Sequence, residues 1–251
     1  MELDNKQFEF IKPLAWEEVF ETWQSNEINE PHWQEYYKKE GFESWLDWRK
    51  KYIEPIKAMN KDWKLVKVVS PLKSVPNFHG GPYKGWDKNF YEGRDLPIFA
   101  ELKEHWASAE FLKNLPAKTT IIAWNTEIGI VIIEGMHRCA AITKAAKEKE
   151  DLKLDLYIVM ADCPLSDIPD FRKKKEFTKE EAKRIGDGIG IDWNKYGLEQ
   201  FRMGLGVELE HGLCDAETNV TNDDETMTGK IALAHLKEIP DYYTRLDKME
   251  K

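Results

Sequence analysis

The segment Val131-Ile-Ile-Glu-Gly-Met-His-Arg-Cys-Ala-Ala-Ile142 decides how the middle of this chain folds. Its first residues are β-branched and apolar, as in a buried strand, and Ala140 and Ala141 begin a run of strong helix formers. Gly135 stands where the strand must turn into the helix, and glycine allows the backbone to approach a ligand closely. The segment therefore predicts a strand, a tight turn and a helix.

The predicted turn has the features of an anion-binding site. The first N–H groups of a helix point outward with a partial positive charge, and the donor fork of Arg138 suits a phosphate. His137 can donate a hydrogen bond or carry a proton, and Glu134 can hold Mg²⁺ or act as a base. The alternative is structural: Arg138 pairs with a neighbouring carboxylate, and His137 is an ordinary surface residue.

The sequence around this turn predicts a small α/β domain over residues 64–171. The pattern indicates a strand at 65–69, a helix at 98–115 stopped by Pro116, a hairpin formed by 119–124 and 128–133, and a returning strand at 152–160.

A loop from Pro71 to Pro97 interrupts this domain. It holds too many glycines and prolines for regular structure and is long enough to be functional. We expect it to cover the turn, with His79 and Lys84 as further phosphate contacts. Its aromatic residues are Phe78, Tyr83 and Trp86. They either stack on a base or shape a substrate pocket, or they only pack the loop on itself.

The first block, residues 1–63, is rich in aromatic residues at helical spacing, beginning with Trp16, Val19, Phe20 and Trp23. Such spacing predicts two or three amphipathic helices, with Ser44 as the N-cap of the last. Aromatic residues at this spacing are typical of a core, so we expect the block to pack on the α/β domain rather than to present a binding surface.

The last block, residues 176–251, predicts an acidic helical module. It carries 17 acidic and 10 basic residues, a net charge of −7. A helix capped by Thr178 is expected first, then helices over 197–211 and 227–238, and a short final helix after Pro240.

Two short motifs in this module suggest a metal site. Glu208 and His211 form an ExxH motif, and His235 and Glu238 form an HxxE motif. Residues three apart share a helix face, so an antiparallel helix pair would bring all four side chains to a zinc, iron or manganese ion. The alternative is a core histidine that is hydrogen-bonded to Glu208 or Glu210.

Composition limits the function further. The 251 residues carry a net charge of −9, and the pI is about 5.3, which argues against a protein that coats nucleic acid. Its three cysteines form no CxxC pair and favour a reducing, cytoplasmic setting; they are Cys139, Cys163 and Cys214. The longest apolar run, residues 128–133, is too short to span a bilayer, so no membrane partner is expected.

The turn Gly135-Met-His-Arg138 resembles the G-x-H-R turn of the ParB/sulfiredoxin superfamily, and the resemblance extends over about residues 64–162. It implies a mixed-sheet α/β (α+β) domain that binds nucleotide phosphates through Gly135, Met136, His137 and Arg138. Met136 stands where sulfiredoxins carry their catalytic cysteine, and no basic recognition helix is visible. Peroxiredoxin repair and chromosome partition are therefore not expected.

What the resemblance implies is phosphoryl transfer or NTP hydrolysis. The ligand would be a nucleoside tri- or diphosphate with Mg²⁺, and the catalytic residues would be Glu134, His137 and Arg138. One alternative is a non-catalytic adaptor or nucleotide sensor whose helical module binds a protein partner. Another, which comes from the family label, is a ParB-like nuclease or nucleic-acid-binding protein. About residues 178–249 resemble an uncharacterised helical domain of phage and bacterial proteins. This resemblance implies a domain boundary near Arg172 and no established activity, and it leaves a phage-related or accessory role open.

Overall fold

The computed structural model describes residues 5–39, 42–105, 108–149, 152–172, 177–212, 218–221 and 223–249. Its contacts divide the chain into two units, one of residues 1–38 with 42–172 and one of residues 39–41 with 173–251. We call them the sheet unit and the helical unit, and each has a hydrophobic core of its own. Cys214 lies outside the described residues.

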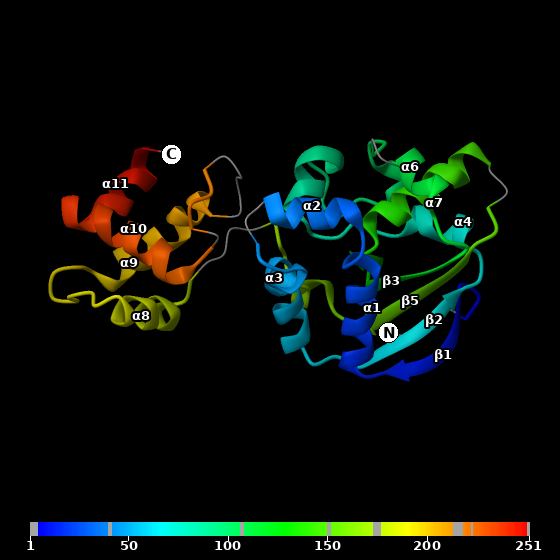
Figure 1. Ribbon diagram of the computed structural model, residues 1–251, viewed down its shortest axis with the longest axis horizontal. Helices are drawn as coiled ribbons and strands as arrows, with labels where there is room; N and C mark the ends of the chain where they lie inside the picture. The colour runs from blue at the N-terminus through cyan, green and yellow to red at the C-terminus, as the bar shows by residue number, and fades with distance from the viewer. Residues whose placement is uncertain are drawn as a thin grey trace. The chain divides into compact units, whose positions relative to one another are not determined.

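A five-stranded mixed sheet forms the centre of the sheet unit (Figure 1). Its strands are β1 (Phe8–Leu14), β2 (Trp63–Val68), β3 (Lys118–Thr126), β4 (Gly129–Glu134) and β5 (Asp155–Asp162). They lie in the order β1-β2-β5-β3-β4; β3 and β5 are parallel, and the other neighbours are antiparallel. The expected α/β class with a mixed sheet is therefore confirmed.

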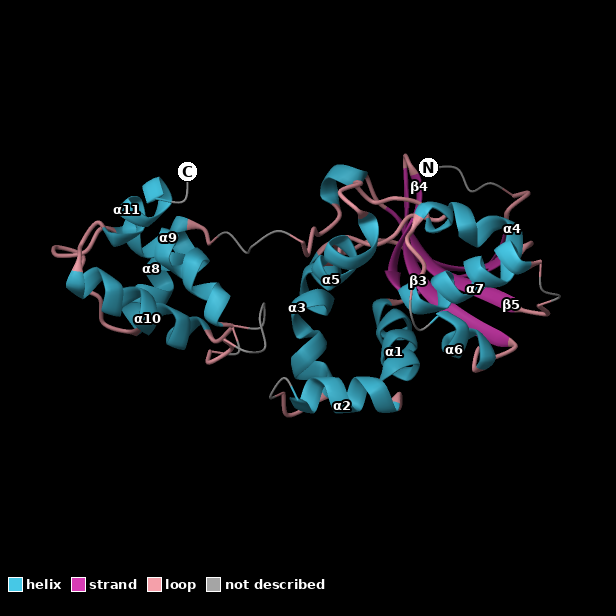
Figure 2. Ribbon diagram, turned by 90° about the horizontal axis from the view of Figure 1, so that it is seen from above, coloured by secondary structure: helices cyan, strands magenta, loops and turns pink. Residues whose placement is uncertain are grey.

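The predicted strand, turn and helix are present. β3 and β4 form the hairpin, with Thr126 opposite Gly129, and α7 (Met136–Glu148) follows β4 after Gly135. Both hairpin strands and β5 are strongly apolar and buried, which holds the end of β4 firmly in the core. α7 lies beside α4 (Pro71–Ser74) and α6 (Ser108–Lys113) in both ribbon views (Figures 1 and 2).

The first 63 residues contribute a strand as well as helices. The helices are α1 (Trp16–Glu27), α2 (Pro31–Lys39) and α3 (Trp45–Ala58). Ser44 caps α3 as predicted, because its Oγ accepts a hydrogen bond of 3.1 Å from the N–H of Asp47. β1 was not expected: it pairs with β2 at the edge of the sheet, so this block completes the sheet and is not a helical segment alone.

The prediction of one helix over residues 98–115 is wrong. A single turn of 3₁₀-helix, η3 (Phe99–Glu101), ends at the extended residue Leu102, and α6 begins only at Ser108. The N–H of Phe99 donates to the carbonyl of Phe78 at 2.9 Å, and Phe99, Leu102 and His105 are all buried. Tertiary packing therefore overrides the helical propensity of this stretch.

The helical unit contains the expected helices. They are α8 (Lys179–Gly188), α9 (Leu198–Glu208) with the 3₁₀ turn η5 (Leu209–His211), α10 (Glu225–Glu238) and α11 (Tyr242–Met249). Thr178 forms a capping box with Glu181, as predicted. Phe201, Leu205 and Leu236 are fully buried at the centre of this unit. Among the described residues, no helix has the length and apolarity needed to cross a membrane.

Candidate functional site

Gly135 makes the turn between β4 and α7, in a backbone conformation that favours glycine. Its φ is +105°, and a Cβ atom there would lie 2.4 Å from Cγ2 of Ile121. Any other residue would therefore combine backbone strain with a steric clash. The sharp change from strand to helix depends on this one position.

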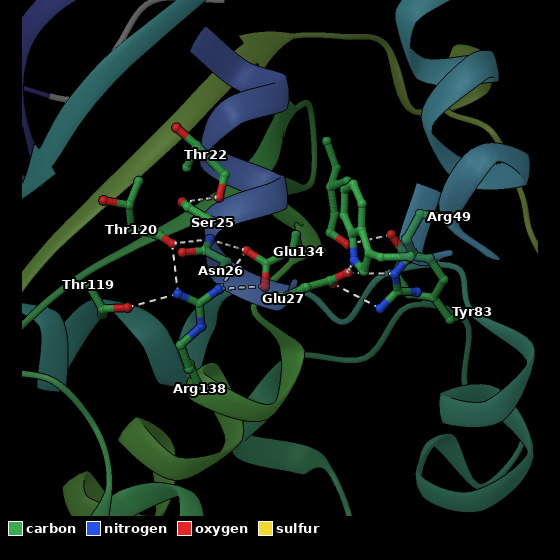
Figure 3. Close-up of polar contacts among 12 residues, drawn as sticks. Thr22, Ser25, Asn26, Glu27, Arg49, Tyr83, Thr119, Thr120, Glu134 and Arg138 are labelled. Atoms are coloured by element: carbon green, nitrogen blue, oxygen red, sulfur yellow. Dashed lines mark hydrogen bonds and ion pairs between the residues drawn. The ribbon is translucent and has the colours of Figure 1, made fainter. Parts of the chain in front are cut away.

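Arg138 and Glu134 form a buried ion pair across the turn (Figure 3). Nη2 of Arg138 lies 2.5 Å from both carboxylate oxygens, and the two side chains are only 15% and 7% exposed. Nη1 donates to Oγ1 of Thr119 and to the carbonyl of Thr120, each at 2.8 Å. The guanidinium thus holds the turn against β3. Arg138 pairs with a neighbouring carboxylate, which is the alternative to a free phosphate-binding guanidinium.

The amide of Asn26, in α1, completes this network. Its Nδ2 donates to Oε2 of Glu134 at 2.7 Å and to the carbonyl of Thr120 at 2.9 Å. Burial raises the pKa of Glu134, although Arg138 and Asn26 both oppose that rise. Since both oxygens of this carboxylate are already bonded, Mg²⁺ would have to displace Arg138 or Asn26, and the site does not fit Mg²⁺ through Glu134.

A second buried ion pair lies next to the first (Figure 3). Nε and Nη2 of Arg49 donate to the two oxygens of Glu27 at 2.6 and 2.8 Å, and Nε1 of Trp45 donates to Oε2 at 2.9 Å. The guanidinium also lies 3.7 Å from the ring centre of Trp48. Burial alone would lower the pKa of Arg49, but Glu27 raises it above its ordinary value.

Three main-chain N–H groups at the start of α7 are left without partners. The first main-chain hydrogen bond of the turn runs from the N–H of Cys139 to the carbonyl of Gly135, at 2.9 Å. Among the described residues nothing accepts from the N–H groups of Met136, His137 and Arg138, and no side chain caps the helix. A ligand oxyanion is the group that such N–H groups bind best.

The imidazole of His137 lies in an aromatic cluster. It stacks on Phe111 with the ring centres 4.9 Å apart, and it lies within 6.5 Å of the rings of His32, Trp86 and His105. Burial, reinforced by the charges of His105 and His32, lowers the pKa of His137 to about 3. The ring is therefore uncharged at neutral pH, and it is packed rather than placed as an ordinary surface side chain.

The loop between Pro71 and Pro97 runs along β4, but the prediction that it has no regular structure is wrong. It contains α4, the 3₁₀ turn η1 (Val75–Asn77), the short helix α5 (Lys84–Trp86) and the π-helical turn η2 (Asp87–Tyr91). The main chain of His79 pairs with Ile130 and Ile132, and the hydroxyl of Tyr83 donates to the carbonyl of Ile133. Gly81 comes so close that a Cβ atom would lie 2.1 Å from the carbonyl oxygen of Ile132. The loop is thus fixed to the strand that leads into the turn.

The side chains of this loop divide between the core and the surface. Phe78 is 1% exposed, so it belongs to the core and cannot stack on a base. Both ring nitrogens of His79 face main-chain carbonyl oxygens, Nδ1 that of Leu96 at 2.5 Å and Nε2 that of Ile128 at 2.9 Å, so the ring is held within the fold. His79 and Lys84 were both predicted to contact phosphate. Lys84 is exposed, and its side chain forms no bond among the described residues.

Cys139 lies one residue beyond Arg138 and is fully buried. Burial raises the pKa of its thiol, so a reactive thiolate is disfavoured.

The four residues of the predicted metal site do not all meet. Glu208 is buried, and Nε2 of His211 and of His235 each lie 3.6 Å from one of its oxygens. Glu238 is exposed and has no bond to them. In the described part of the chain, no three His, Cys, Asp or Glu side chains are grouped as metal ligands. The distances of 3.6 Å also exclude the predicted hydrogen bond between a histidine and Glu208.

Five residues of the network in Figure 3 belong to no motif in the sequence; they are Asn26, Glu27, Arg49, Thr119 and Thr120. One signal was available for Glu27. It follows Val19 and Trp23 at intervals of four residues, so it lies on the apolar face of α1, and all three are buried. A charged residue in such a position needs a buried partner, which Arg49 provides.

In comparison with known proteins, one part of the chain matches a protein family. Residues 182–251 match a family described as "Protein of unknown function (DUF5661)". This stretch lies within the helical unit and includes α9, α10 and α11. No curated protein and no solved structure matches the chain.

Proposed function

We propose that the sheet unit binds the phosphate groups of a nucleotide, or of another phosphorylated small molecule, at the start of α7. The proposal depends on the three unpartnered N–H groups of Met136, His137 and Arg138. They belong to a helix of 13 residues, whose dipole adds a partial positive charge at this end. Together they would donate to the oxygens of one phosphate group.

In this proposal Arg138 positions the turn and is not a free donor fork. Its guanidinium is held by Glu134, Thr119 and Thr120, and it neutralises the charge of Glu134. An anion at the unpartnered N–H groups would therefore lie beside a neutralised Arg138–Glu134 pair. It would not be repelled by an unpaired carboxylate. A buried ion pair adds little net stability compared with apolar packing, which makes a role in shaping the site the better explanation for it.

The reaction that we propose is phosphoryl transfer or nucleotide hydrolysis. An oxygen of water or of an alcohol attacks the terminal phosphorus, and the bond from that phosphorus to the bridging oxygen breaks. The proton of the nucleophile passes to Glu134, one of whose oxygens must first lose its bond to Asn26 or Arg138; burial raises the pKa of this carboxyl group, which favours its protonated form. His137, which is uncharged at neutral pH, contributes its main-chain N–H.

A nucleotide sensor is the second candidate, and one observation favours it. The guanidinium of Arg138 is fully engaged, so it is not free to stabilise the charge of a phosphoryl group during transfer. The sheet unit would then bind a nucleotide without turnover, and the helical unit would bind a protein partner. Nucleic acid is a poorer ligand, because the net charge of −9 opposes it.

An NMR titration of the ¹⁵N-labelled full chain tests the binding site directly. Pyrophosphate, ADP, ATP, CTP and GTP are added separately, and adenosine serves as the control without phosphate. We expect a saturable shift of the amide signals of Met136, His137 and Arg138 with at least one phosphate ligand and none with adenosine. The proposal is wrong if no phosphate ligand binds, or if binding leaves these three signals in place.

Turnover separates the two candidates. The same nucleotides are incubated with the protein and Mg²⁺, and the products are separated by chromatography. Release of phosphate that is lost in Glu134→Gln supports the enzyme, provided that this variant still binds the nucleotide. Binding at the α7 amides without any product supports the sensor.

A further inference from the structure

The helical unit contains a buried carboxylate that its own residues leave incompletely satisfied. The side chain of Glu208 is 3% exposed. Its Oε1 accepts a hydrogen bond of 2.7 Å from the hydroxyl of Tyr243, whereas Oε2 has no hydrogen-bond partner among the described residues. An unsatisfied buried oxygen of this kind is costly, and the cost is higher for an ionised group.

Two imidazoles lie beside this carboxylate without bonding to it. Nε2 of His211 is 3.6 Å from Oε2, and Nε2 of His235 is 3.6 Å from Oε1. The separation is too long for a hydrogen bond, but it is close to the roughly 3.4 Å between two donor atoms of one tetrahedral zinc ion. The two histidine side chains are 39% and 32% exposed, so solvent reaches the groups that surround Glu208.

No lysine or arginine of the described chain pairs with Glu208. The region from residue 176 onward carries a net charge of −7, which attracts cations over a longer range. Carboxylate oxygens and imidazole nitrogens are both ligands that divalent cations accept. Since no lysine or arginine of the described residues pairs with Glu208, an external cation would complete this cluster.

We propose that Glu208, His211 and His235 form a cation-binding site. The two imidazoles face different oxygens of Glu208, and the side chains are not grouped as preformed metal ligands. The cation is thus either a divalent metal ion that draws the imidazoles inward, or a guanidinium or ammonium group that bridges them. His235 stacks on Tyr242 with ring centres 4.6 Å apart, which holds the plane of its imidazole beside Glu208. The site is independent of the phosphate site proposed above.

Calorimetric titration of the full chain with ZnCl₂ and, separately, with agmatine tests this site and identifies the kind of cation. We expect one of the two to bind saturably, with at least tenfold weaker binding in Glu208→Gln and in His235→Gln. Glu238→Gln is the matched control and should bind like the wild type, because Glu238 is exposed and has no bond to the cluster. Melting curves without the cation show whether each variant is folded.

Several outcomes would overturn the proposal. They are the absence of binding by both cations, wild-type affinity in Glu208→Gln, or equal weakening in Glu238→Gln. NMR of the imidazole protons gives one further outcome that would overturn the proposal. If His211 and His235 are both protonated at neutral pH without a ligand, they supply the positive charge themselves and no cation is needed. His235→Gln keeps the test decisive if Glu208→Gln fails to fold, since His235 is partly exposed.

Discussion

The main-chain N–H of Gly81 donates a hydrogen bond of 3.2 Å to Sδ of Met136. This contact joins two segments 55 residues apart and ties the long loop to the first residue of α7. The hydroxyl of Tyr91 secures the same place by donating to the carbonyl of Gly81 at 2.6 Å. The phosphate site proposed above is therefore bordered by a fixed loop.

Replacement of Gly81 should destabilise the sheet unit. In Gly81→Ala the new Cβ would lie 2.1 Å from a main-chain oxygen, which cannot move aside cheaply. We expect a loss of about 3 kcal/mol or more in the free energy of unfolding, measured by urea denaturation. Gly85→Ala is the matched control, because nothing beyond its chain neighbours lies within 4 Å of the position that its Cβ would take. Equal stability of the two variants would contradict the close approach of the loop to β4.

Removal of Arg138 should destabilise the fold even without a ligand. Arg138→Ala leaves the buried carboxylate of Glu134 without its cation, which typically costs about 3–5 kcal/mol. The double variant Glu134→Gln/Arg138→Ala should lose clearly less than the sum of the single variants Glu134→Gln and Arg138→Ala, because it removes both charges.

Arg94→Ala, which breaks the exposed pair with Glu92, is the control for this cycle and should change stability by less than about 1 kcal/mol. Chemical denaturation of the wild type, the two single variants and the double variant measures the coupling free energy between Arg138 and Glu134. Simple additivity would show that the Arg138–Glu134 pair is not formed.

The cluster around His137 should make the sheet unit less stable in mild acid. An unfolded histidine binds a proton near pH 6.5, whereas folded His137 does so only near pH 3. Stability is therefore fully present above pH 6.5 and is lost as the pH falls from there toward 3.

His137→Phe should remove this dependence while keeping the ring stacked on Phe111. Between pH 7 and pH 5 we expect the variant to lose about 2 kcal/mol less than the wild type, by denaturation at each pH. The carboxyl groups titrate in both proteins, so the difference between the two curves isolates the histidine. Parallel curves would show that His137 titrates normally and is not buried.

His79 and Lys84 should respond differently to substitution. Since the ring of His79 lies between two main-chain carbonyl oxygens and donates to at least one of them, His79→Ala should lower the melting temperature. Lys84→Ala should leave the melting temperature unchanged and weaken nucleotide binding several-fold, as expected for an exposed cation beside a phosphate. Lys88→Ala, also exposed on this loop, is the control for Lys84. Equal affinity in the two lysine variants would remove Lys84 from the phosphate site.

Local signals in the sequence predicted the elements that surround the turn. The caps at Ser44 and Thr178 and the glycine between β4 and α7 were all identified correctly, because each depends on neighbouring residues. β1 could not be found in this way. Of its seven residues only Phe8 is buried, so the strand lacks the alternation of buried and exposed side chains that marks a half-buried strand. Only its pairing with β2 defines it.

The candidate site was predictable only in part. The sequence identified Glu134 and Arg138, but the choice between a free guanidinium and a paired one depends on a third group, Asn26 of α1, which lies 108 residues before Glu134. The buried partners Glu27 and Arg49 are likewise brought together by the packing of two helices. Such long-range pairs leave little trace in one sequence beyond a charge on an apolar helix face.

The position of β5 has a consequence for synthesis on the ribosome. β5 is the last strand to be made, yet it lies between β2 and β3 and joins the two pairs on either side of it. Until residue 162 has left the exit tunnel, a nascent chain holds only two separate hairpin-like pairs, each with an exposed apolar edge. The sheet unit therefore becomes one cooperative body late in translation, and a premature stop before β5 should yield an insoluble product.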